Sequence, residues 1–240
     1  MSAVRPQPKE RVGVVIVAAG HSQRMEGIDK VFALIDNKPL LAWSIAPFEA
    51  SPLVDEIVIA VHRTRVQDGR RLVSEAGLQK VSQVCRGGER RQDSVREALW
   101  RMGKCEWVLV HDGARPCVTA ELISRGIEAA RETGVAVPGI PVRDTVKRAD
   151  GAGIVEQTLE RDGLYAIQTP QVFRYNILWA AHQVDAADAT DDAALVERLG
   201  YAVKVFPGLQ QNIKVTIQED LDAVTAFLSK GTPVKPALLL

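Results

Sequence analysis

Short, continuous apolar runs alternate along this chain with segments whose apolar residues recur every three or four positions. In chain order, the runs and the periodic segments lie at Val12–Ala18, 39–50, Glu56–Val61, 92–102, 107–111, 119–132 and 216–229. A run without alternation is typical of a strand buried on both faces, whereas the longer period is that of a helix with one buried face. The alternation of the two predicts an α/β fold, a mostly parallel sheet with helices on both faces.

The composition of the 240-residue chain is that of a globular protein, with 46% hydrophobic and 25% charged residues. This apolar content excludes disorder as the main state. Basic and acidic residues each number 30, so the formal net charge is zero. We therefore expect neither nucleic acid nor an anionic membrane as a partner. No apolar stretch approaches the roughly 20 residues that a membrane-spanning helix needs.

The two ends of the chain differ from its middle. Residues 1–10 are polar, contain two prolines and lack the shape of a signal peptide, which predicts a flexible N-terminal arm. Residues 231–240 contain two prolines and end in three leucines, which predicts a tail with one packing patch. We expect a single domain over residues 11–230, because no repeat or linker interrupts them. Three scattered cysteines without metal spacing indicate a reducing, cytoplasmic location.

The residues after the first predicted strand suit a polyanion. Parallel sheets bind ligands beyond the carboxyl ends of their strands, and Ala18, Ala19 and Gly20 allow a ligand to approach the backbone closely. Arg24 and Lys30 follow and, with the N–H groups of the turn, would form a cradle for phosphates. Neither the GxGxxG dinucleotide pattern nor the P-loop pattern is present. The alternative is a tight turn with two solvated cations.

A second loop of small residues, Gly87 and Gly88, precedes the segment 92–102. Two glycines before a helix also suit a close approach of the backbone to a ligand. Asp93 and Ser94 stand at the expected start of the helix. Both residues are equally typical helix N-caps, so a purely structural role is the alternative.

Asp112 directly follows the buried run 107–111. A carboxylate at this edge of a sheet can hold Mg²⁺ or a sugar hydroxyl. It can equally cap the next segment or pair with Arg115. His111 would point the other way in a strand, which favours a packed histidine over a catalytic one.

A polar, alternating pattern at 141–148 and 154–159, with a Gly-containing turn between, predicts a hairpin. It has too few large apolar side chains for a core of its own. It either packs on another subunit or forms an exposed surface hairpin.

Three later motifs are individually weak signals: Thr169 with the following Pro-Gln, Thr190 with two aspartates, and Lys214 within NIKVT. The aspartate pair is typical of a helix N-terminus. Thr216 and Glu219 match a capping box at the start of the last helix.

The order of these segments is more specific than any one of them. The matching pieces are AAGHSQRM with Lys30, GGERRQDSV, VLVHDGARP, PVRDTVKR, LERDGLYAIQTPQVF, TDDAALVE and NIKVT. Over residues 12–227 the chain resembles the 2-C-methyl-D-erythritol 4-phosphate cytidylyltransferases of the non-mevalonate isoprenoid pathway. The resemblance implies a Rossmann-like core of the nucleotide-diphospho-sugar transferase type, CTP and a polyol phosphate as substrates, and Mg²⁺ dependence. It also implies a homodimer that exchanges a β-arm at about 141–162.

The resemblance also assigns roles to individual residues. Those implied to bind the nucleotide are Ala18, Ala19, Gly20, Gly88, Ser94 and Asp112. Those implied to bind the polyol phosphate are Asp112, Arg115, Thr145, Arg161, Thr169, Thr190 and Lys214, with Thr145 and Arg161 reaching the neighbouring subunit's substrate. Those implied to be catalytic are Arg24, Lys30, Arg161 and Lys214. Asp112 is the candidate metal ligand, with Mg²⁺ held mainly by the triphosphate.

The implied reaction is an in-line attack of the substrate phosphate on the α-phosphorus of CTP, with release of pyrophosphate. The nucleophile is already anionic at neutral pH, because the second pKa of a phosphate monoester is about 6, so no protein base is needed. Cations and positioning then supply the catalysis. The chain departs from the family pattern at Ser22, Asp29, Val31 and Glu89, and Asp29 would weaken the field of Lys30 if the two paired.

Three other functions remain open at this stage. A cytidylyltransferase for another polyol phosphate, such as ribitol 5-phosphate, would share the nucleotide half and differ in the arm. A nucleotide-sugar glycosyltransferase would usually carry an Asp-x-Asp metal motif after a strand, and His111-Asp112-Gly113 lacks it. A non-enzymatic nucleotide-binding module would not need all four cations.

Overall fold

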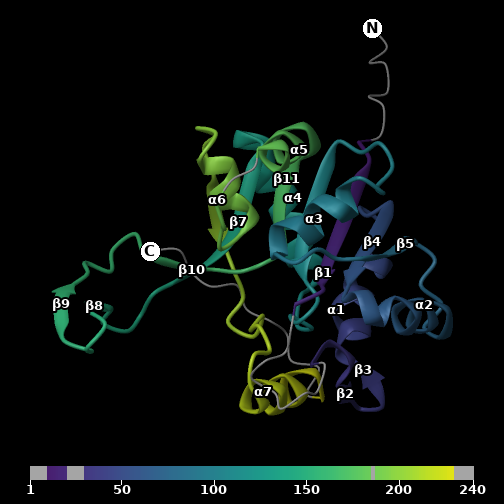
Figure 1. Ribbon diagram of the computed structural model, residues 1–240, viewed down its shortest axis with the longest axis horizontal. Coiled ribbons are helices and arrows are strands. Elements are labelled where there is room, and N and C mark those ends of the chain that lie inside the picture. The colour runs from purple at the N-terminus through teal and green to yellow at the C-terminus, as the bar shows by residue number, and fades with distance from the viewer. Residues whose placement is uncertain (1–9, 21–29, 185–186, 230–240) are drawn as a thin grey trace, which may run out of the picture.

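The structure is a computed structural model that describes residues 10–20, 30–184 and 187–229. Its centre is an eight-stranded sheet in the order β10-β7-β11-β6-β1-β4-β5, with β12 paired to β7 (Figure 1). The strands are β1 (Val12–Ala18), β4 (Glu56–Val61), β5 (Val81–Arg86), β6 (Trp107–Asp112), β7 (Val135–Pro141), β10 (Tyr165–Ile167), β11 (Gln171–Arg174) and β12 (Lys204–Pro207).

Parallel pairing dominates the sheet. Strands β6, β1, β4 and β5 run parallel to one another, and β12 runs parallel to β7. Two short strands, β10 and β11, are antiparallel to their neighbours. The predicted α/β fold with a mostly parallel sheet is therefore confirmed. The carboxyl ends of β1 and β6 lie side by side, with Val17 opposite Asp112.

Helices cover both faces of this sheet. One face packs against α1 (Leu40–Ala50), α2 (Val66–Glu75) and α4 (Ala120–Thr133), and the other packs against α3 (Arg91–Leu99), α5 (Tyr175–Gln183) and α6 (Asp192–Glu197). Strand β1 divides its side chains accordingly, with Val14 and Ile16 in the first core and Val15 in the second. This is the two-sided burial that the unbroken apolar run predicts.

The ends of the helices follow local capping chemistry. Thr119 caps α4 by accepting a hydrogen bond from the Leu122 N–H at 3.2 Å, and Gly134, at φ +84°, ends it. The capping box predicted at the start of α7 (Gln218–Ser229) paired Thr216 with Glu219, and this choice of acidic residue was wrong. The carboxylate that accepts from the Thr216 N–H, at 2.7 Å, belongs to Asp220 one position later, because the helix begins later than expected.

Small elements complete the core. The turn η1 (Lys30–Phe32) leads into a two-stranded pair, β2 (Leu34–Ile35) and β3 (Lys38–Pro39), and η2 (Arg63–Arg65) precedes α2. Helix α7 and the start of α1 contribute Val224 and Leu40 to a separate apolar cluster. In Figure 1 α7 lies below the main sheet.

A hairpin of β8 (Lys147–Ala149) and β9 (Val155–Thr158) stands away from the rest of the protein (Figure 1, left). All seven strand residues are exposed. At its turn, Asp150 accepts hydrogen bonds from two backbone N–H groups at 2.9 Å. Ile154 and Val155 are 66% and 54% exposed. The predicted hairpin is thus present and protrudes as one unit.

The predicted N-terminal arm, apart from Glu10, and the predicted C-terminal tail lie outside the described residues. Glu10 pairs with Arg131 at 2.7 Å, so this residue is anchored to α4. Within the described part of the chain, no helix is long and apolar enough to cross a membrane.

Candidate active site

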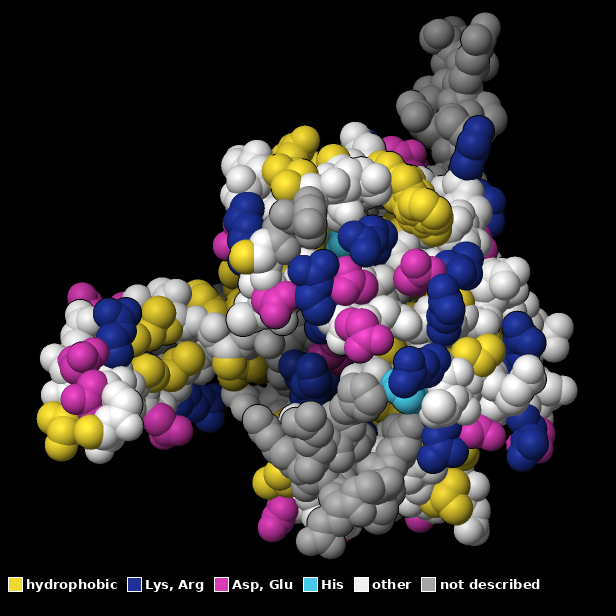
Figure 2. Space-filling view, in the orientation of Figure 1, with side chains coloured by type: hydrophobic (Ala, Val, Ile, Leu, Met, Phe, Trp, Pro, Cys, Tyr) yellow, Lys and Arg dark blue, Asp and Glu magenta, His cyan; other side chains and the backbone are white. Residues whose placement is uncertain are grey.

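A pocket lies at the carboxyl ends of β1 and β6. Eight residues expected at the nucleotide and phosphates line it: Ala18, Ala19, Gly20, Lys30, Gly88, Ser94, Asp112 and Lys214. These residues come from five separate segments of the chain. Figure 2 shows basic and acidic side chains interspersed in the middle of this face. The fold therefore brings most of the predicted nucleotide site together.

The two small-residue loops touch each other. A Cβ atom at Gly87 would lie 2.3 Å from the Ala19 Cβ and 2.6 Å from the Ser94 Oγ. Real side chains do not approach this closely, so only glycine fits at position 87. Ser94 Oγ accepts a hydrogen bond from the Gly88 N–H at 3.1 Å and donates to the Arg90 carbonyl at 3.2 Å. Ser94 thus holds the glycine loop against the start of α3.

The structure also decides how α3 is capped. Asp93 accepts from the Arg90 N–H at 3.2 Å and completes a capping box. Of the two candidate caps, Asp93 is therefore structural, whereas Ser94 shapes the pocket lining.

Asp112 lies at the end of β6 with its carboxylate among three cations. Its Oδ2 atom is 2.9 Å from Lys214 Nζ and 3.6 Å from Arg115 Nε, and its Oδ1 atom accepts from Arg91 Nε at 3.3 Å. Burial alone would raise the pKa of Asp112, but Arg91, Lys214 and Arg115 together hold it well below its usual range. The carboxylate is therefore ionised throughout the neutral pH range.

His111 has a structural role behind this carboxylate. Its Nε2 atom donates to the Arg115 carbonyl at 3.1 Å, and its Nδ1 atom is 3.0 Å from the Thr169 hydroxyl. The same hydroxyl accepts from the Asp112 N–H at 3.1 Å. Complete burial lowers the pKa of His111 to about 4, so the ring is neutral. This agrees with the prediction of a packed histidine.

The segment after β12 is tied to the same edge of the sheet. Asn212 donates to the Thr169 carbonyl at 2.8 Å and accepts from Arg115 Nη1 at 2.7 Å through its own carbonyl. The Val215 N–H donates to the Ala114 carbonyl at 2.8 Å. These contacts place Lys214 over Asp112. The role of Asn212 was not foreseen, because a lone asparagine in a loop carries no periodic signal.

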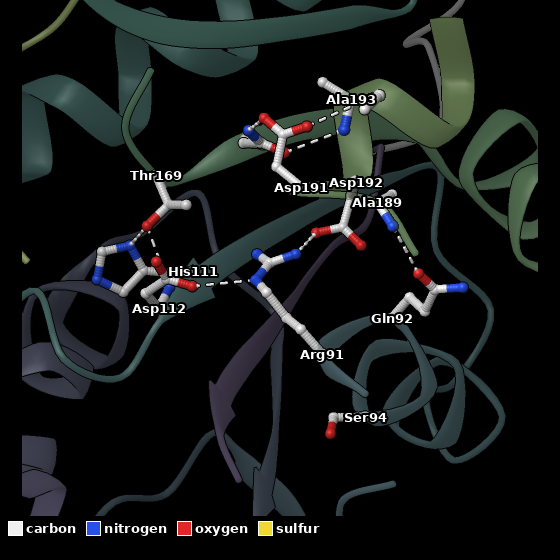
Figure 3. Close-up of polar contacts among 12 residues, drawn as sticks. Arg91, Gln92, Ser94, His111, Asp112, Thr169, Ala189, Asp191, Asp192 and Ala193 are labelled. Carbon is white, nitrogen blue, oxygen red and sulfur yellow. Dashed lines mark hydrogen bonds and ion pairs between the residues drawn. The ribbon is translucent and has the colours of Figure 1, made fainter. Parts of the chain in front are cut away.

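Arg91 is the main pocket residue that the sequence analysis missed. It lies between two carboxylates, Asp112 and Asp192 (Figure 3), and its Nη1 atom donates to Asp192 at 2.5 Å. Asp192 also accepts from His182 Nε2 at 3.1 Å. Asp191, by contrast, is the expected N-cap of α6 and accepts from the Ala194 N–H at 2.9 Å. The only signal for Arg91 was its place just after the glycine loop.

Five predicted residues do not line this pocket among the described parts of the chain. One of them, Arg115, instead pairs with Asp112. Thr145 and Arg161 are exposed on the hairpin arm, and Arg161 Nη1 donates to the Arg143 carbonyl at 2.6 Å. Thr190 is exposed beside α6. Thr169 is buried behind Asp112. The exposed three are positions for which the sequence predicted contacts with a substrate or a second subunit.

Of the four departures from the family pattern, Val31 and Glu89 lie within the described residues. Val31 is 4% exposed and packs in the core, and Glu89 lines the pocket. Arg24, Ser22 and Asp29 lie outside the described residues. Lys30 lines the pocket and lies near Asp220, whose pKa it helps to lower.

The described residues contain no group of three or more His, Cys, Asp or Glu side chains that could hold a metal ion. Among the described residues that line the pocket, the carboxylates are those of Glu89 and Asp112, and both oxygens of Asp112 already face cationic side chains. This arrangement does not fit a metal held by the protein alone. It fits at most one protein ligand for a cation that the substrate brings.

An α/β sheet with glycine loops and clustered cations at its carboxyl edge is the arrangement expected of a nucleotidyltransferase. The sequence pattern of the 2-C-methyl-D-erythritol 4-phosphate cytidylyltransferases matches residues 12–230. The chain belongs to this family.

Individual relatives agree with this assignment. The chain is 46% identical over 222 residues to the enzyme of that name from Dehalococcoides mccartyi. The aligned region covers 92% of this chain and 98% of the relative. Among solved structures, it is similar to 2-C-methyl-D-erythritol 4-phosphate cytidylyltransferase from Thermus thermophilus, with a TM-score of 0.74, 32% identity, and coverage of 90% and 98%. It is also similar to 4-diphosphocytidyl-2C-methyl-D-erythritol synthase from Anaerococcus prevotii, with a TM-score of 0.80, 27% identity, and coverage of 92% and 100%.

Proposed function

We propose that this chain transfers CMP from CTP to 2-C-methyl-D-erythritol 4-phosphate, giving 4-diphosphocytidyl-2-C-methyl-D-erythritol and pyrophosphate. The observation that carries the proposal is one pocket in which two small-residue loops face the ionised Asp112 and the cations Lys30, Arg91 and Lys214. The family to which the chain belongs is named for this reaction.

The chemistry needs positioning and positive charge more than a base. The attacking phosphate oxygen is anionic at neutral pH, since its second pKa is about 6. The bond from this oxygen to the α-phosphorus forms while the bond to pyrophosphate breaks. Lys30 is proposed to stabilise the charge that develops on the triphosphate, together with Arg24. Lys214 and Arg161 are proposed to hold the attacking phosphate in line.

The remaining assignments follow the same geometry. Backbone groups of Ala18, Ala19, Gly20 and Gly88 are proposed to approach the nucleotide, because all four residues are small and line the pocket. Asp112 is proposed to meet the ribose side of the nucleotide and the polyol phosphate. The substrate-contact roles of Arg115, Thr145, Thr169 and Thr190 are likewise proposals.

A divalent cation, Mg²⁺ in the cell, is proposed to arrive with the triphosphate, with Asp112 as its single protein ligand. Mg²⁺ commonly binds through one or two carboxylates plus substrate phosphates. When bound, it neutralises phosphate charge. The residues described above bind and orient the substrates.

The arm supports a proposal about assembly. Its strands are fully exposed, Ile154 and Val155 at the start of β9 face solvent, and Arg161 does not line the pocket. We propose a homodimer in which Thr145 and Arg161 of each arm serve the partner's site. Residues 11–230 are proposed to act as one domain, because a single main sheet organises the described core.

The three cysteines, Cys85, Cys105 and Cys117, are free in the structure. Free thiols are usual for proteins of a reducing compartment. They support the proposed cytoplasmic location.

The direct test is release of pyrophosphate from CTP and Mg²⁺ with methylerythritol 4-phosphate, and with ribitol 5-phosphate as the competing acceptor. ATP, GTP and UTP serve as nucleotide controls. We expect turnover only with CTP and methylerythritol phosphate. Turnover with ribitol phosphate instead would keep the mechanism and move the substrate. No release with any pair would refute the proposed function.

The shared site has a sharper test. Two differently tagged chains, one Arg161→Ala and one Lys214→Met, are co-expressed and the mixed dimer is purified through both tags. If each site takes Arg161 from the partner, the mixed dimer has one intact site, which combines Lys214 of one chain with Arg161 of the other. We then expect about half of the wild-type activity. Each single-variant homodimer stays inactive. A mixed dimer as inactive as the parents would refute the exchange of arms.

A further inference from the structure

A chain of buried polar groups extends behind the pocket from β6 to α5. His182 Nε2 donates to Asp192 Oδ1 at 3.1 Å, and Asp192 Oδ2 accepts from Arg91 Nη1 at 2.5 Å. Arg91 Nε then donates to Asp112 Oδ1 at 3.3 Å. Asp192 is 0% exposed and His182 is 4% exposed. Neither of these two residues lines the pocket, so neither is placed to touch a substrate.

Arg91 is divided between two acids. A guanidinium group can bind one carboxylate through two parallel N–H groups, and that geometry is strong. Arg91 instead donates from Nη1 to Asp192 and from Nε to Asp112, and its buried Nη2 has no hydrogen-bond partner among the described residues. Because Asp192 accepts the hydrogen bond from Arg91 Nη1, the Oδ2 atom of Asp112 stays available to Lys214 Nζ, which lies 2.9 Å away.

A buried ion pair is weak evidence for stability, because desolvation of both charges offsets their attraction. Burial alone would raise the pKa of the Asp192 carboxyl. Arg91 and His182 together lower it by more, so the pKa lies below its ordinary value. Asp192 is therefore an anion at neutral pH, held between two donors. Burying the Asp192 anion costs desolvation free energy. Its visible geometric effect is that it orients Arg91.

We propose that Asp192 is a positioning residue that orients Arg91, and that His182 fixes Asp192 for this task. Through Arg91, the pair keeps Asp112 shared between α3 and Lys214 instead of locked to a single guanidinium. The kinetic consequence rests on the proposed function. The structural consequence, the orientation of Arg91, does not.

The test compares Asp192→Asn with Glu197→Gln, a matched acid-to-amide change at an exposed position of the same helix. A second pair separates hydrogen bonding from packing. His182→Gln keeps a donor near the position of Nε2, whereas His182→Leu removes it. Thermal unfolding of each variant shows that it is folded.

The kinetic readout is the separation of kcat from KM. Misplacement of a site group by about 1 Å can cost on the order of 100-fold in rate. We expect Asp192→Asn and His182→Leu to lower kcat by about 10- to 100-fold, with KM for CTP changed by less than about threefold. His182→Gln should recover most of the lost kcat, and Glu197→Gln should match the wild type.

The second readout needs no turnover. In protein with ¹⁵N-labelled arginine, the Nε–H signal of Arg91 is assigned by its loss in Arg91→Lys. We expect this signal to shift and to exchange faster with water in Asp192→Asn and His182→Leu, but not in His182→Gln. An unchanged Arg91 signal in folded Asp192→Asn would overturn the inference. If the wild type proved inactive towards CTP, the proposed function would fail, while this signal would still decide the positioning role.

Discussion

Lys214 Nζ lies 2.9 Å from Asp112 Oδ2, although one residue follows the last strand of the sheet and the other ends a central one. Asn212 makes this possible by binding the Thr169 carbonyl beside Asp112. The pair joins the loop before α7 to the carboxyl edge of β6. It therefore places a cation from a late segment at the centre of the pocket.

Replacing Lys214 by methionine removes that cation and keeps most of the side chain's volume. We expect kcat/KM for methylerythritol phosphate to fall by about 10²–10³, the usual loss for one donor to a developing charge. Stability should change little, because the Lys214 side chain is 40% exposed. The control is Lys204→Met, whose ammonium pairs with Glu132 on the surface. Steady-state kinetics with equal losses in both variants would contradict the role of Lys214.

Lys30→Ala tests stabilisation of the triphosphate. Since charge develops on the leaving pyrophosphate, we expect kcat to fall by about 10²–10³ and the affinity for CTP to fall much less. Calorimetric titration with CTP gives the affinity separately from the rate. Lys38→Ala is the matched control, because Lys38 lies on β3 and does not line this pocket. A Lys30→Ala enzyme with wild-type kcat would remove Lys30 from the mechanism.

Gly87→Ala tests the contact between the two glycine loops. The new methyl group would meet Ala19 and Ser94 at 2.3 and 2.6 Å, so one loop must move. We expect a destabilisation of about 1–3 kcal/mol and weaker binding of CTP. Gly151→Ala in the arm is the control, because a Cβ there meets nothing within 4 Å. Chemical denaturation and CTP titration provide the two measurements, and wild-type values for both in Gly87→Ala would show that the loops are not in contact.

His111 predicts a pH dependence of stability. The folded protein keeps the ring neutral down to a pKa of about 4, whereas the unfolded chain protonates it near 6.5. The contribution of His111 is therefore complete above about pH 6.5 and is lost as the pH falls from 6.5 towards 4. Between pH 7 and pH 5 the free energy of unfolding should fall by about 2 kcal/mol from this residue.

The check is urea unfolding of the wild type and of His111→Gln at both pH values. The variant lacks the titrating ring and should lose less stability between pH 7 and pH 5 than the wild type does, whatever its stability at pH 7. Identical losses in the two proteins would show that His111 is not the titrating group.

Much of the fold could be predicted from the sequence because burial on two faces leaves a direct signal. The runs Val12–Ala18 and Glu56–Val61 coincide with β1 and β4. Helix ends were less certain, as at α7, where Asp220 and Glu219 are chemically similar and one residue apart. Such a choice depends on where the helix packs, which local spacing does not contain.

The site was predicted where residue type and strand position coincide, as for Asp112 at the end of β6. Arg91 was missed because its partners Asp112 and Asp192 become neighbours only when α3, β6 and α6 assemble. Arg161 shows the opposite case, since a motif named it while the described pocket of one chain does not contain it.

The charge around Asp112 has one more consequence. Arg91, Arg115 and Lys214 carry three positive charges and Asp112 and Asp192 carry two negative ones, a local surplus of one on a chain with zero net charge. Screening in physiological salt limits such a surplus to about 8 Å. A distant anion therefore feels almost no pull from the protein as a whole. Nucleotides and phosphates are therefore expected to reach the pocket by unsteered diffusion. The protein selects among them only through the contacts that they make at the mouth of the pocket.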